Sequence, residues 1–249
     1  MSDTTYKPGL APIPDEFGDK LPVTEVFSSV QGEGRWAGYP AVFIRLAYCN
    51  LGCIWCDTRY TWDNTKLDRG TLLDATQIAE RAAALIEDID SVPHAIITGG
   101  EPMLHQVRLP QLIDQLMKVG FSFFEMETNG TIVPSDELRN RVTWWNCSPK
   151  LRNSGLNDAD MCIPGAVSAI AATGKADFKF VIRSQSDVEE LLSTYGNHMS
   201  RESIMLMPEG SSASAQLAVM PMVLEACRRY GFRFSPRYHI LSWGNLRGK

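Results

Sequence analysis

Three of the six cysteines in this 249-residue chain lie close together, at Cys49, Cys53 and Cys56. Cysteines this near to one another in a short loop are poorly placed for disulfides among themselves, but three thiolates can converge on one metal centre. The spacing is C-x3-C-x2-C, and the nearest histidine along the chain is His94. A [4Fe-4S] cluster held by three thiolates keeps one iron free for a non-protein ligand. The loop therefore predicts an open iron–sulfur site.

The same thiols allow two other interpretations. Structural zinc also binds Cys and His at short spacings, and its fourth ligand could come from Cys147, Cys162, Cys227 or a distant His. The three cysteines could also be unligated residues of the core. The shortage of nearby ligands favours the cluster over both.

The composition is that of an ordinary globular protein, with 44% hydrophobic and 21% charged residues. A formal net charge of -5 argues against a broad nucleic-acid-binding surface, so we expect no direct contact with nucleic acid. The chain has no apolar run of about 18 residues, and its N-terminus lacks a signal-peptide pattern. We therefore expect a cytoplasmic protein without membrane contact, in a compartment where thiols stay reduced.

Length alone allows one or two domains. The polar motifs described below are spread along the chain but must meet at one site, so we expect one domain over residues 21–249. Residues 1–20 carry Pro8, Pro12 and Pro14 without hydrophobic periodicity. This pattern indicates an N-terminal arm that is flexible or wraps the surface.

Strand signals recur along the domain. Short β-type runs occupy residues 21–30, 41–47, 94–98, 121–128, 142–147, 177–182 and 203–207. Helical periodicity covers residues 74–89 and 110–119 between them. Strands that alternate with helices predict an α/β fold with parallel pairing, although the helices are too few for an eightfold barrel.

Capping patterns place the helix ends. Asp74 and Gln77 form a capping box at the start of the first helix. Ser186 and Glu189 form a second box, which predicts a helix between the last two strands. Pro221 lies within the final helical pattern, and that helix is expected to start or kink there.

Several motifs fall at or near the ends of these strands. They are Phe27-Ser28-Ser29-Val30-Gln31-Gly32-Glu33-Gly34, Phe43-Ile44-Arg45, Cys56-Asp57-Thr58, Thr98-Gly99-Gly100-Glu101-Pro102, Glu127-Thr128-Asn129-Gly130 and Ser148-Pro149-Lys150. Together with the cysteine spacing, they resemble the radical S-adenosylmethionine enzymes and, within them, the 7-carboxy-7-deazaguanine synthase family. The resemblance runs from about Leu21 to His239. It implies an incomplete, modified (β/α) barrel whose site lies in the loops after the strands.

The resemblance also implies an activity. Residues 21–249 would form a radical S-adenosylmethionine catalytic domain, a lyase that contracts 6-carboxy-5,6,7,8-tetrahydropterin to 7-carboxy-7-deazaguanine with loss of ammonia, for queuosine or another deazapurine. Its cofactors would be a [4Fe-4S] cluster with three Cys ligands, S-adenosylmethionine and Mg2+, and no side chain would act as acid or base. A homodimer and a reductant such as flavodoxin are further implications.

Individual residues acquire expected roles from the same resemblance. The cluster would be held by Cys49, Cys53 and Cys56, and Mg2+ by the hydroxyl of Thr58, an oxygen ligand of the kind that Mg2+ prefers. The S-adenosylmethionine side would include Trp55, Asp57, Gly100, Glu101, Ser148, Lys150, Met207, Pro208 and Glu209. The substrate side would include Val30, Gln31, Gly32, Glu33, Arg45, Thr98, Glu127 and His239.

Residue chemistry supports part of this assignment. Paired glycines after a strand, at Gly99 and Gly100, let a ligand approach the backbone, and the following Glu101 can accept a hydrogen bond from an ammonium group. Arg45 lies in an otherwise apolar strand and suits the substrate carboxylate, because arginine binds carboxylates through two parallel hydrogen bonds. The alternative for Arg45 is a structural ion pair with Glu33.

Two other functions compete with the lyase. A radical activase that takes hydrogen from a protein glycine would share the cysteine motif, but it would need a broad docking surface. A ferredoxin-like or zinc-binding module would need no substrate pocket. The segment after His239 is undecided from sequence, since Trp243, Asn245 and Arg247 could line the substrate, cover the core or form a dimer contact.

Overall fold

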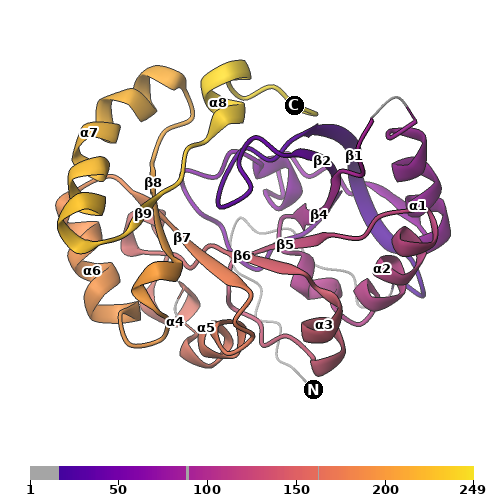
Figure 1. Ribbon diagram of the computed structural model, residues 1–249, viewed down its shortest axis with the longest axis horizontal. Coiled ribbons are helices and arrows are strands. Elements are labelled where there is room, and N and C mark those ends of the chain that lie inside the picture. Colours follow the sequence, from indigo (N-terminus) through magenta and orange to yellow (C-terminus); the bar gives the residue numbers. More distant parts are fainter. Residues whose placement is uncertain (1–16, 88–89, 162) are drawn as a thin grey trace.

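A nine-stranded sheet organises the chain in the computed structural model, which describes residues 17–87, 90–161 and 163–249 (Figure 1). The strand order is β3-β1-β2-β4-β5-β6-β7-β8-β9. β1 pairs antiparallel with β2 and β3, and every neighbouring pair from β2 to β9 is parallel. The strands are β1 Leu21–Val30, β2 Pro40–Leu46, β3 Thr71–Leu73, β4 His94–Gly99, β5 Phe124–Thr128, β6 Trp144–Cys147, β7 Ala176–Ile182, β8 Ile204–Pro208 and β9 Arg233–Phe234.

The helices surround a curved sheet that does not close. Figure 1 shows α1 to α7 around the outside of the strands, while α8 and the C-terminal end lie on the open side. The helices are α1 Ala75–Ala84, α2 Leu109–Lys118, α3 Asp136–Arg141, α4 Asp158–Met161, α5 Pro164–Ala171, α6 Gln185–Tyr195, α7 Ala213–Tyr230 and α8 Tyr238–Trp243. The prediction of an α/β fold built as an incomplete barrel is therefore confirmed.

All seven predicted strands are found, with small shifts at their ends. The run predicted to begin at 121 begins at Phe124, because the Phe121 N–H bonds back to the Leu116 carbonyl at 3.1 Å and closes α2. The short edge strands β3 and β9 were not predicted, since two or three residues carry no periodicity.

The capping predictions had mixed outcomes. Asp74 and Gln77 form the predicted box at the start of α1, but that helix ends at Ala84 rather than 89. The box at Ser186 and Glu189 is wrong, because both residues lie inside α6. Its cap is Ser184, whose N–H donates to the Asp187 carboxylate at 2.9 Å.

Pro221 does not start the last long helix. α7 begins at Ala213 behind the cap Ser212, whose hydroxyl accepts from the Ala215 N–H, and it runs past Pro221 to Tyr230. A proline removes one backbone hydrogen bond within a helix. Packing of Val223, Ala226 and Cys227 into the core keeps the helix continuous across that gap.

The two faces of the sheet differ in chemistry. In β7, Phe178, Phe180 and Ile182 are buried among the apolar residues of the main core. The alternate residues Asp177 and Lys179 are also buried, at 0% and 1% exposure. Because side chains alternate along a strand, these charged residues lie on the opposite face from the phenylalanines. That polar face is the inner wall of the site described below.

Only residues 17–20 of the predicted N-terminal arm lie in the described ranges. The Phe17 ring packs against the ring of Tyr48, with centroids 5.6 Å apart, and the Gly18 carbonyl accepts from Arg108 Nε at 2.7 Å. This end of the arm therefore lies against the domain. Among the described residues, no helix combines the length and apolar character needed to cross a membrane.

Candidate functional site

The cysteine loop leaves the carboxyl end of β2 through a strained residue. Tyr48 has a φ of 73°, the one positive value for a non-glycine residue in the described ranges. Its N–H donates to the Thr61 carbonyl at 2.7 Å, and its own carbonyl accepts from the Glu101 N–H at 2.8 Å. Such a conformation persists only where the surroundings enforce it. These bonds place the next residue, Cys49, at the edge of a cavity.

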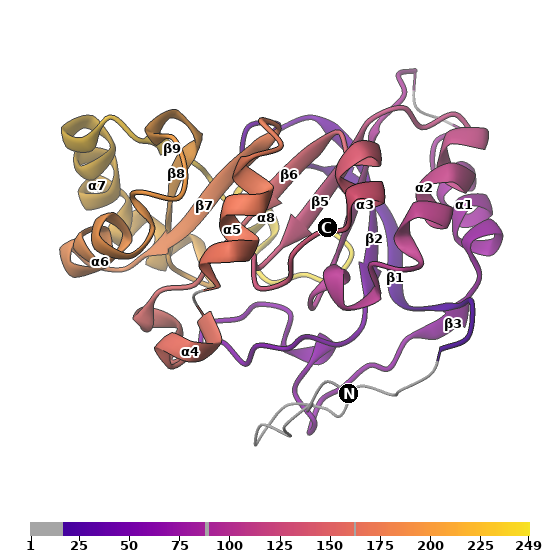
Figure 2. The same ribbon diagram turned by 90° about the horizontal axis from the view of Figure 1, so that it is seen from below.

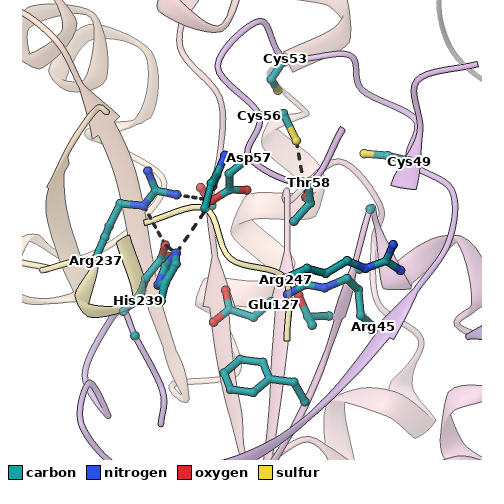
Figure 3. Close-up of a pocket in the computed structure, with 18 of the residues that line it drawn as sticks. Arg45, Cys49, Cys53, Cys56, Asp57, Thr58, Glu127, Arg237, His239 and Arg247 are labelled. Carbon is teal, nitrogen blue, oxygen red and sulfur yellow. Dashed lines mark hydrogen bonds and ion pairs between the residues drawn. The ribbon is translucent and has the colours of Figure 1, made fainter. Parts of the chain in front are cut away.

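Cys49, Cys53 and Cys56 line that one cavity, and all three are free thiols (Figure 3). The Leu51 N–H donates to Cys49 Sγ at 3.4 Å, and Cys56 Sγ lies 3.5 Å from Thr58 Oγ1. Hydrogen bonds to the sulfurs are among the features that tune iron–sulfur clusters. Three thiols that face one space fit a [4Fe-4S] cluster with one iron left for another ligand.

Burial controls the protonation of these thiols. It raises the pKa of Cys53 to about 11. Burial, together with the nearby Glu101 carboxylate, raises the pKa of Cys49 well above its usual value. Because metals bind the thiolate form, loading of iron must displace these protons.

The zinc alternative finds no fourth cysteine at the cavity within the described ranges. Cys147 on β6 and Cys227 on α7 are buried, but neither lines the cavity, and Cys162 lies outside the described residues. No three His, Cys, Asp or Glu side chains in those ranges are grouped so that they could hold one metal ion. Thr58, the predicted Mg2+ ligand, lines the cavity.

The two glycines at the end of β4 allow close packing of the backbone. A Cβ on Gly99 would lie 2.2 Å from the Leu46 carbonyl oxygen, and one on Gly100 would lie 2.2 Å from the Tyr48 carbonyl oxygen. Their space is thus taken by the start of the cysteine loop, whereas the sequence argument reserved it for a ligand. Both glycines nevertheless line the cavity.

Glu101 is fully buried and is not among the cavity-lining residues. Its carboxylate accepts from the N–H groups of Met103 and Asn129 at 2.9 and 2.6 Å, and from the Thr128 hydroxyl at 2.8 Å. Burial raises its pKa to about 7, although these hydrogen bonds act in the opposite direction. In the structure this carboxylate ties the end of β4 to the end of β5, a role that sequence reasoning missed.

Opposite the cysteines, two carboxylates face the cavity from different elements. Glu33 follows β1 and Glu127 lies on β5, and their side chains are 18% and 20% exposed. Lys179 Nζ lies 2.9 Å from Glu33 Oε2 and 2.8 Å from Glu127 Oε2. Gln31 Nε2 donates to Glu127 Oε1 at 3.1 Å. The predicted substrate-side residues are thus joined by a buried lysine that sequence reasoning missed.

Arg237 joins the substrate side to the cysteine loop. Its Nε donates to Glu33 Oε1 at 3.1 Å, and its Nη2 pairs with the Asp57 carboxylate (Figure 3). Burial alone would raise the pKa of Glu33, but Lys179 and Arg237 outweigh it and lower that pKa to about 2. Glu33 is therefore ionised at neutral pH, and Asp57 is engaged by an arginine.

His239 lies over the Gln31-Gly32-Glu33 loop. A Cβ on Gly32 would lie 2.3 Å from His239 Nδ1, so a glycine is needed for the ring to sit there. His239 Nε2 is 3.9 Å from oxygens of both Glu33 and Asp57. The histidine is thus held at the cavity wall beside the same two carboxylates.

Arg45 lines the cavity, and its structural partner is not the Glu33 considered from sequence. Its Nε donates to Glu25 Oε2 at 2.9 Å, across the β1–β2 pair in which these two residues are opposite each other. Its other guanidinium nitrogens have no hydrogen-bond partner within the described ranges. Arg45 can therefore keep Glu25 and still present donors to a ligand.

The C-terminal segment forms part of the cavity wall. Gly244, Asn245, Leu246, Arg247, Gly248 and Lys249 line the cavity, whereas Trp243 does not. Arg247 pairs with Glu25 and Asp68, and its guanidinium lies 4.2 Å from the centroid of the Tyr60 ring. Asn245 and Arg247 therefore line the cavity, and Trp243 lies outside it.

Comparison with known proteins agrees with this geometry. A family model described as the radical SAM superfamily matches residues 44–148. The 7-carboxy-7-deazaguanine synthase of Pyrobaculum aerophilum is 39% identical over 234 residues, which cover 92% of this chain and 98% of that protein. The chain belongs to the 7-carboxy-7-deazaguanine synthase family. The Escherichia coli K12 synthase is 33% identical, with 88% of this chain and 97% of that protein covered.

Solved structures extend the comparison. The crystal structure of QueE from Escherichia coli matches with a TM-score of 0.64 and 28% identity, and covers 88% of this chain and 95% of that one. Native anSMEcpe with bound AdoMet matches with a TM-score of 0.54 and 13% identity, and covers 75% of this chain and 60% of that one. The second likeness is evidence for the fold alone.

In this member of the synthase family, most residues singled out from sequence meet at one cavity. The lining residues among them are Val30, Gln31, Gly32, Glu33, Arg45, Cys49, Cys53, Trp55, Cys56, Asp57, Thr58, Thr98, Gly100, Glu127, Ser148, Lys150, Met207 and His239. Those that do not line it are Glu101, Pro208 and Glu209. On the predicted cofactor side, Lys150 Nζ lies 3.0 Å from Ser148 Oγ and 5.4 Å from the centroid of the Trp55 ring.

Proposed function

We propose that this chain converts 6-carboxy-5,6,7,8-tetrahydropterin to 7-carboxy-7-deazaguanine with release of ammonia. One observation supports this most directly: three free thiols and the polar set of Gln31, Glu33, Arg45 and Glu127 line a single cavity. When bound, a [4Fe-4S] cluster and S-adenosylmethionine supply the 5'-deoxyadenosyl radical that takes hydrogen from C6 of the pterin. No side chain needs to act as acid or base.

Different residues of the cavity would bind the cluster, the cofactor and the substrate. Cys49, Cys53 and Cys56 would hold the cluster, and Ser148, Lys150 and Trp55, which line the same cavity, would bind S-adenosylmethionine. Arg45 would bind the substrate carboxylate through its unpaired guanidinium nitrogens. Glu33 and Glu127 would accept hydrogen bonds from the guanidine edge of the pterin, because both are oriented to the cavity and each oxygen retains a lone pair.

Thr58 would supply one oxygen to Mg2+, which usually keeps several waters and binds few protein ligands. The substrate carboxylate would complete the shell beside Arg45. The same proposal includes a reductant such as flavodoxin, a homodimer, and a product that feeds queuosine or another deazapurine. It also places the reaction in the cytoplasm, because an open cluster suits a reducing compartment.

The decisive experiment is an anaerobic assay of reconstituted protein with the carboxytetrahydropterin, S-adenosylmethionine, Mg2+ and a reductant. We expect 7-carboxy-7-deazaguanine and ammonia in equal amounts. A preparation that holds the full iron complement and cleaves S-adenosylmethionine, but leaves the pterin unchanged, would contradict the proposed substrate while keeping the radical chemistry.

A further inference from the structure

The buried ammonium of Lys179 bridges the two cavity carboxylates from behind. Its side chain is 1% exposed and does not line the cavity, whereas Glu33 and Glu127 both do. The three residues come from different parts of the fold, since Lys179 lies on β7, Glu127 on β5 and Glu33 in the loop after β1. Lys179 therefore reaches a ligand only through these two carboxylates.

Each carboxylate oxygen already has one donor from the protein. Lys179 Nζ donates to one oxygen of Glu33 and to one oxygen of Glu127. Arg237 donates to the second oxygen of Glu33, and Gln31 donates to the second oxygen of Glu127. A carboxylate oxygen has two lone pairs, so one acceptor position per oxygen is left. The arrangement holds the two groups in fixed orientations as acceptors.

We propose that Lys179 is a positioning residue that sets substrate specificity, by holding Glu33 and Glu127 as a matched pair of acceptors for a ligand edge made of N–H donors. This inference rests on the proposed function, since the guanidine edge of a pterin is such a ligand. A ligand with a carbonyl at the same place would bring its oxygen, an acceptor, against these carboxylate oxygens, which are also acceptors. The site would therefore reject it.

The charges around the pair explain why the lysine is required. Glu33 faces Lys179, Arg237 and His239, and Glu127 faces Lys179, Glu33 and Glu125. Burial raises the pKa of Glu127 above its usual value, and the Lys179 ammonium acts against that rise. Burial alone would lower the pKa of Lys179, but the two carboxylates raise it above its usual value, so the ammonium stays charged.

Without that ammonium, two partly buried carboxylates would lie close together, and Arg237 would pair with Glu33 alone. Like charges in one site raise the pKa of one partner, so a proton would be shared between Glu33 and Glu127 near neutral pH. A protonated carboxyl group can donate a hydrogen bond to a carbonyl oxygen. The variant site would therefore bind the carbonyl compound that the parent site rejects.

The test measures a ratio of affinities. Cluster-loaded protein without reductant is titrated with a 2-amino pterin and with the matching pteridine that carries a carbonyl in place of the 2-amino group. We expect the parent to prefer the 2-amino compound, and Lys179→Met to lose that preference by roughly tenfold or more, the scale of one charge-assisted hydrogen bond. The preference should return as pH is raised, because the shared proton is then lost.

Controls separate this role from folding. A merely structural lysine would lower the fraction of competent protein and weaken both ligands equally, leaving the ratio unchanged. Lys175→Met removes a lysine directly before β7, outside the cavity, and should leave the ratio at the parental value. If Lys179→Met does not fold, Lys179→Gln keeps a hydrogen-bond donor without the charge and should show the same loss of preference.

The outcomes of the two proposals are distinct. A parent protein that binds neither pteridine would overturn the proposed substrate. A parent that binds both equally would overturn the specificity role inferred for the Lys179-held pair. A parent that discriminates, beside a folded Lys179→Met or Lys179→Gln variant with the same ratio at every pH, would overturn the role of Lys179 alone.

Discussion

Replacement of Arg45 by alanine separates substrate binding from radical chemistry. If its guanidinium binds the substrate carboxylate, Arg45→Ala loses a charge-assisted contact worth about 1.5–3 kcal/mol. kcat/KM should then fall by roughly 10- to 150-fold. Arg45→Lys should recover part of this, because an ammonium keeps the charge but lacks the planar two-point geometry.

The structure predicts that the stability of this variant changes little. Arg45 is 16% exposed and pairs with Glu25, but Glu25 also accepts from the Tyr60 hydroxyl at 2.9 Å and pairs with Arg247. Glu25 therefore keeps two partners when Arg45 is removed. The expected cost is about 1 kcal/mol, the scale of one hydrogen bond, and less than the roughly 3–5 kcal/mol lost when a buried charge is left unpaired.

The assay compares melting temperature, iron content, uncoupled S-adenosylmethionine cleavage and product on the same preparations. The first three should stay near the parental values while product falls. Arg141→Ala is the matched control, since Arg141 also pairs with a carboxylate, Asp114, but lies outside the cavity. A stable, iron-replete Arg45→Ala enzyme with undiminished kcat/KM would refute the substrate role, and a parallel loss of iron and activity would make Arg45 structural.

Three further predictions test other parts of the site. Anaerobically reconstituted protein should hold about four irons, and Cys53→Ala should lose them together with S-adenosylmethionine cleavage. Cys227→Ala, on α7 away from the cavity, should keep both. Iron analysis is the measurement, and a Cys53→Ala protein with its full iron content would contradict the three-thiol site. Thr58→Ala should require more Mg2+ for half-maximal turnover, and an unchanged Mg2+ dependence would exclude the hydroxyl as a ligand. The ion pairs of Glu33 lower its pKa from 4.5 to about 2, so its ionised form stabilises the fold above pH 4.5 and this contribution is lost as pH falls toward 2. In thermal melts the parent should therefore be more stable than Glu33→Gln at neutral pH, and this difference in melting temperature should disappear between pH 4.5 and 2. A difference that stays constant over that range would be evidence against the ion pairs.

Local chemistry was the part of the structure that sequence could predict. The Asp74–Gln77 cap depends on residues three positions apart, and it forms as expected. The Ser186 prediction failed because a second capping pattern, Ser184 with Asp187, overlaps it. The helix starts at the pattern that lets Val188 and Leu191 pack into the core. That packing depends on the tertiary structure and is not encoded in the capping pattern itself.

The ion pairs of the substrate side were out of reach for a different reason. Lys179 lies 146 positions from Glu33, and Arg237 lies 204 positions from it, so no short motif contains either pair. A weak signal did exist in β7, where Asp177 and Lys179 alternate with Phe178 and Phe180. Charged residues at every second position of an otherwise apolar strand indicate a polar inner face.

The two halves of the site therefore depend on the fold in different ways. The three thiols come from one loop after β2, which is held by the turn at Tyr48 and by two hydrogen bonds to the segment after β6. In these bonds the Ile54 N–H donates to the Ser154 carbonyl and Trp55 Nε1 donates to Asn153 Oδ1. The acceptor pair needs β5 and β7 in register and the segment after β9 in place, because Lys179 and Arg237 hold Glu33 from there. Damage to the C-terminal half of the sheet should thus impair substrate recognition before it impairs the thiol loop, since the loop makes none of those ion pairs except through Asp57.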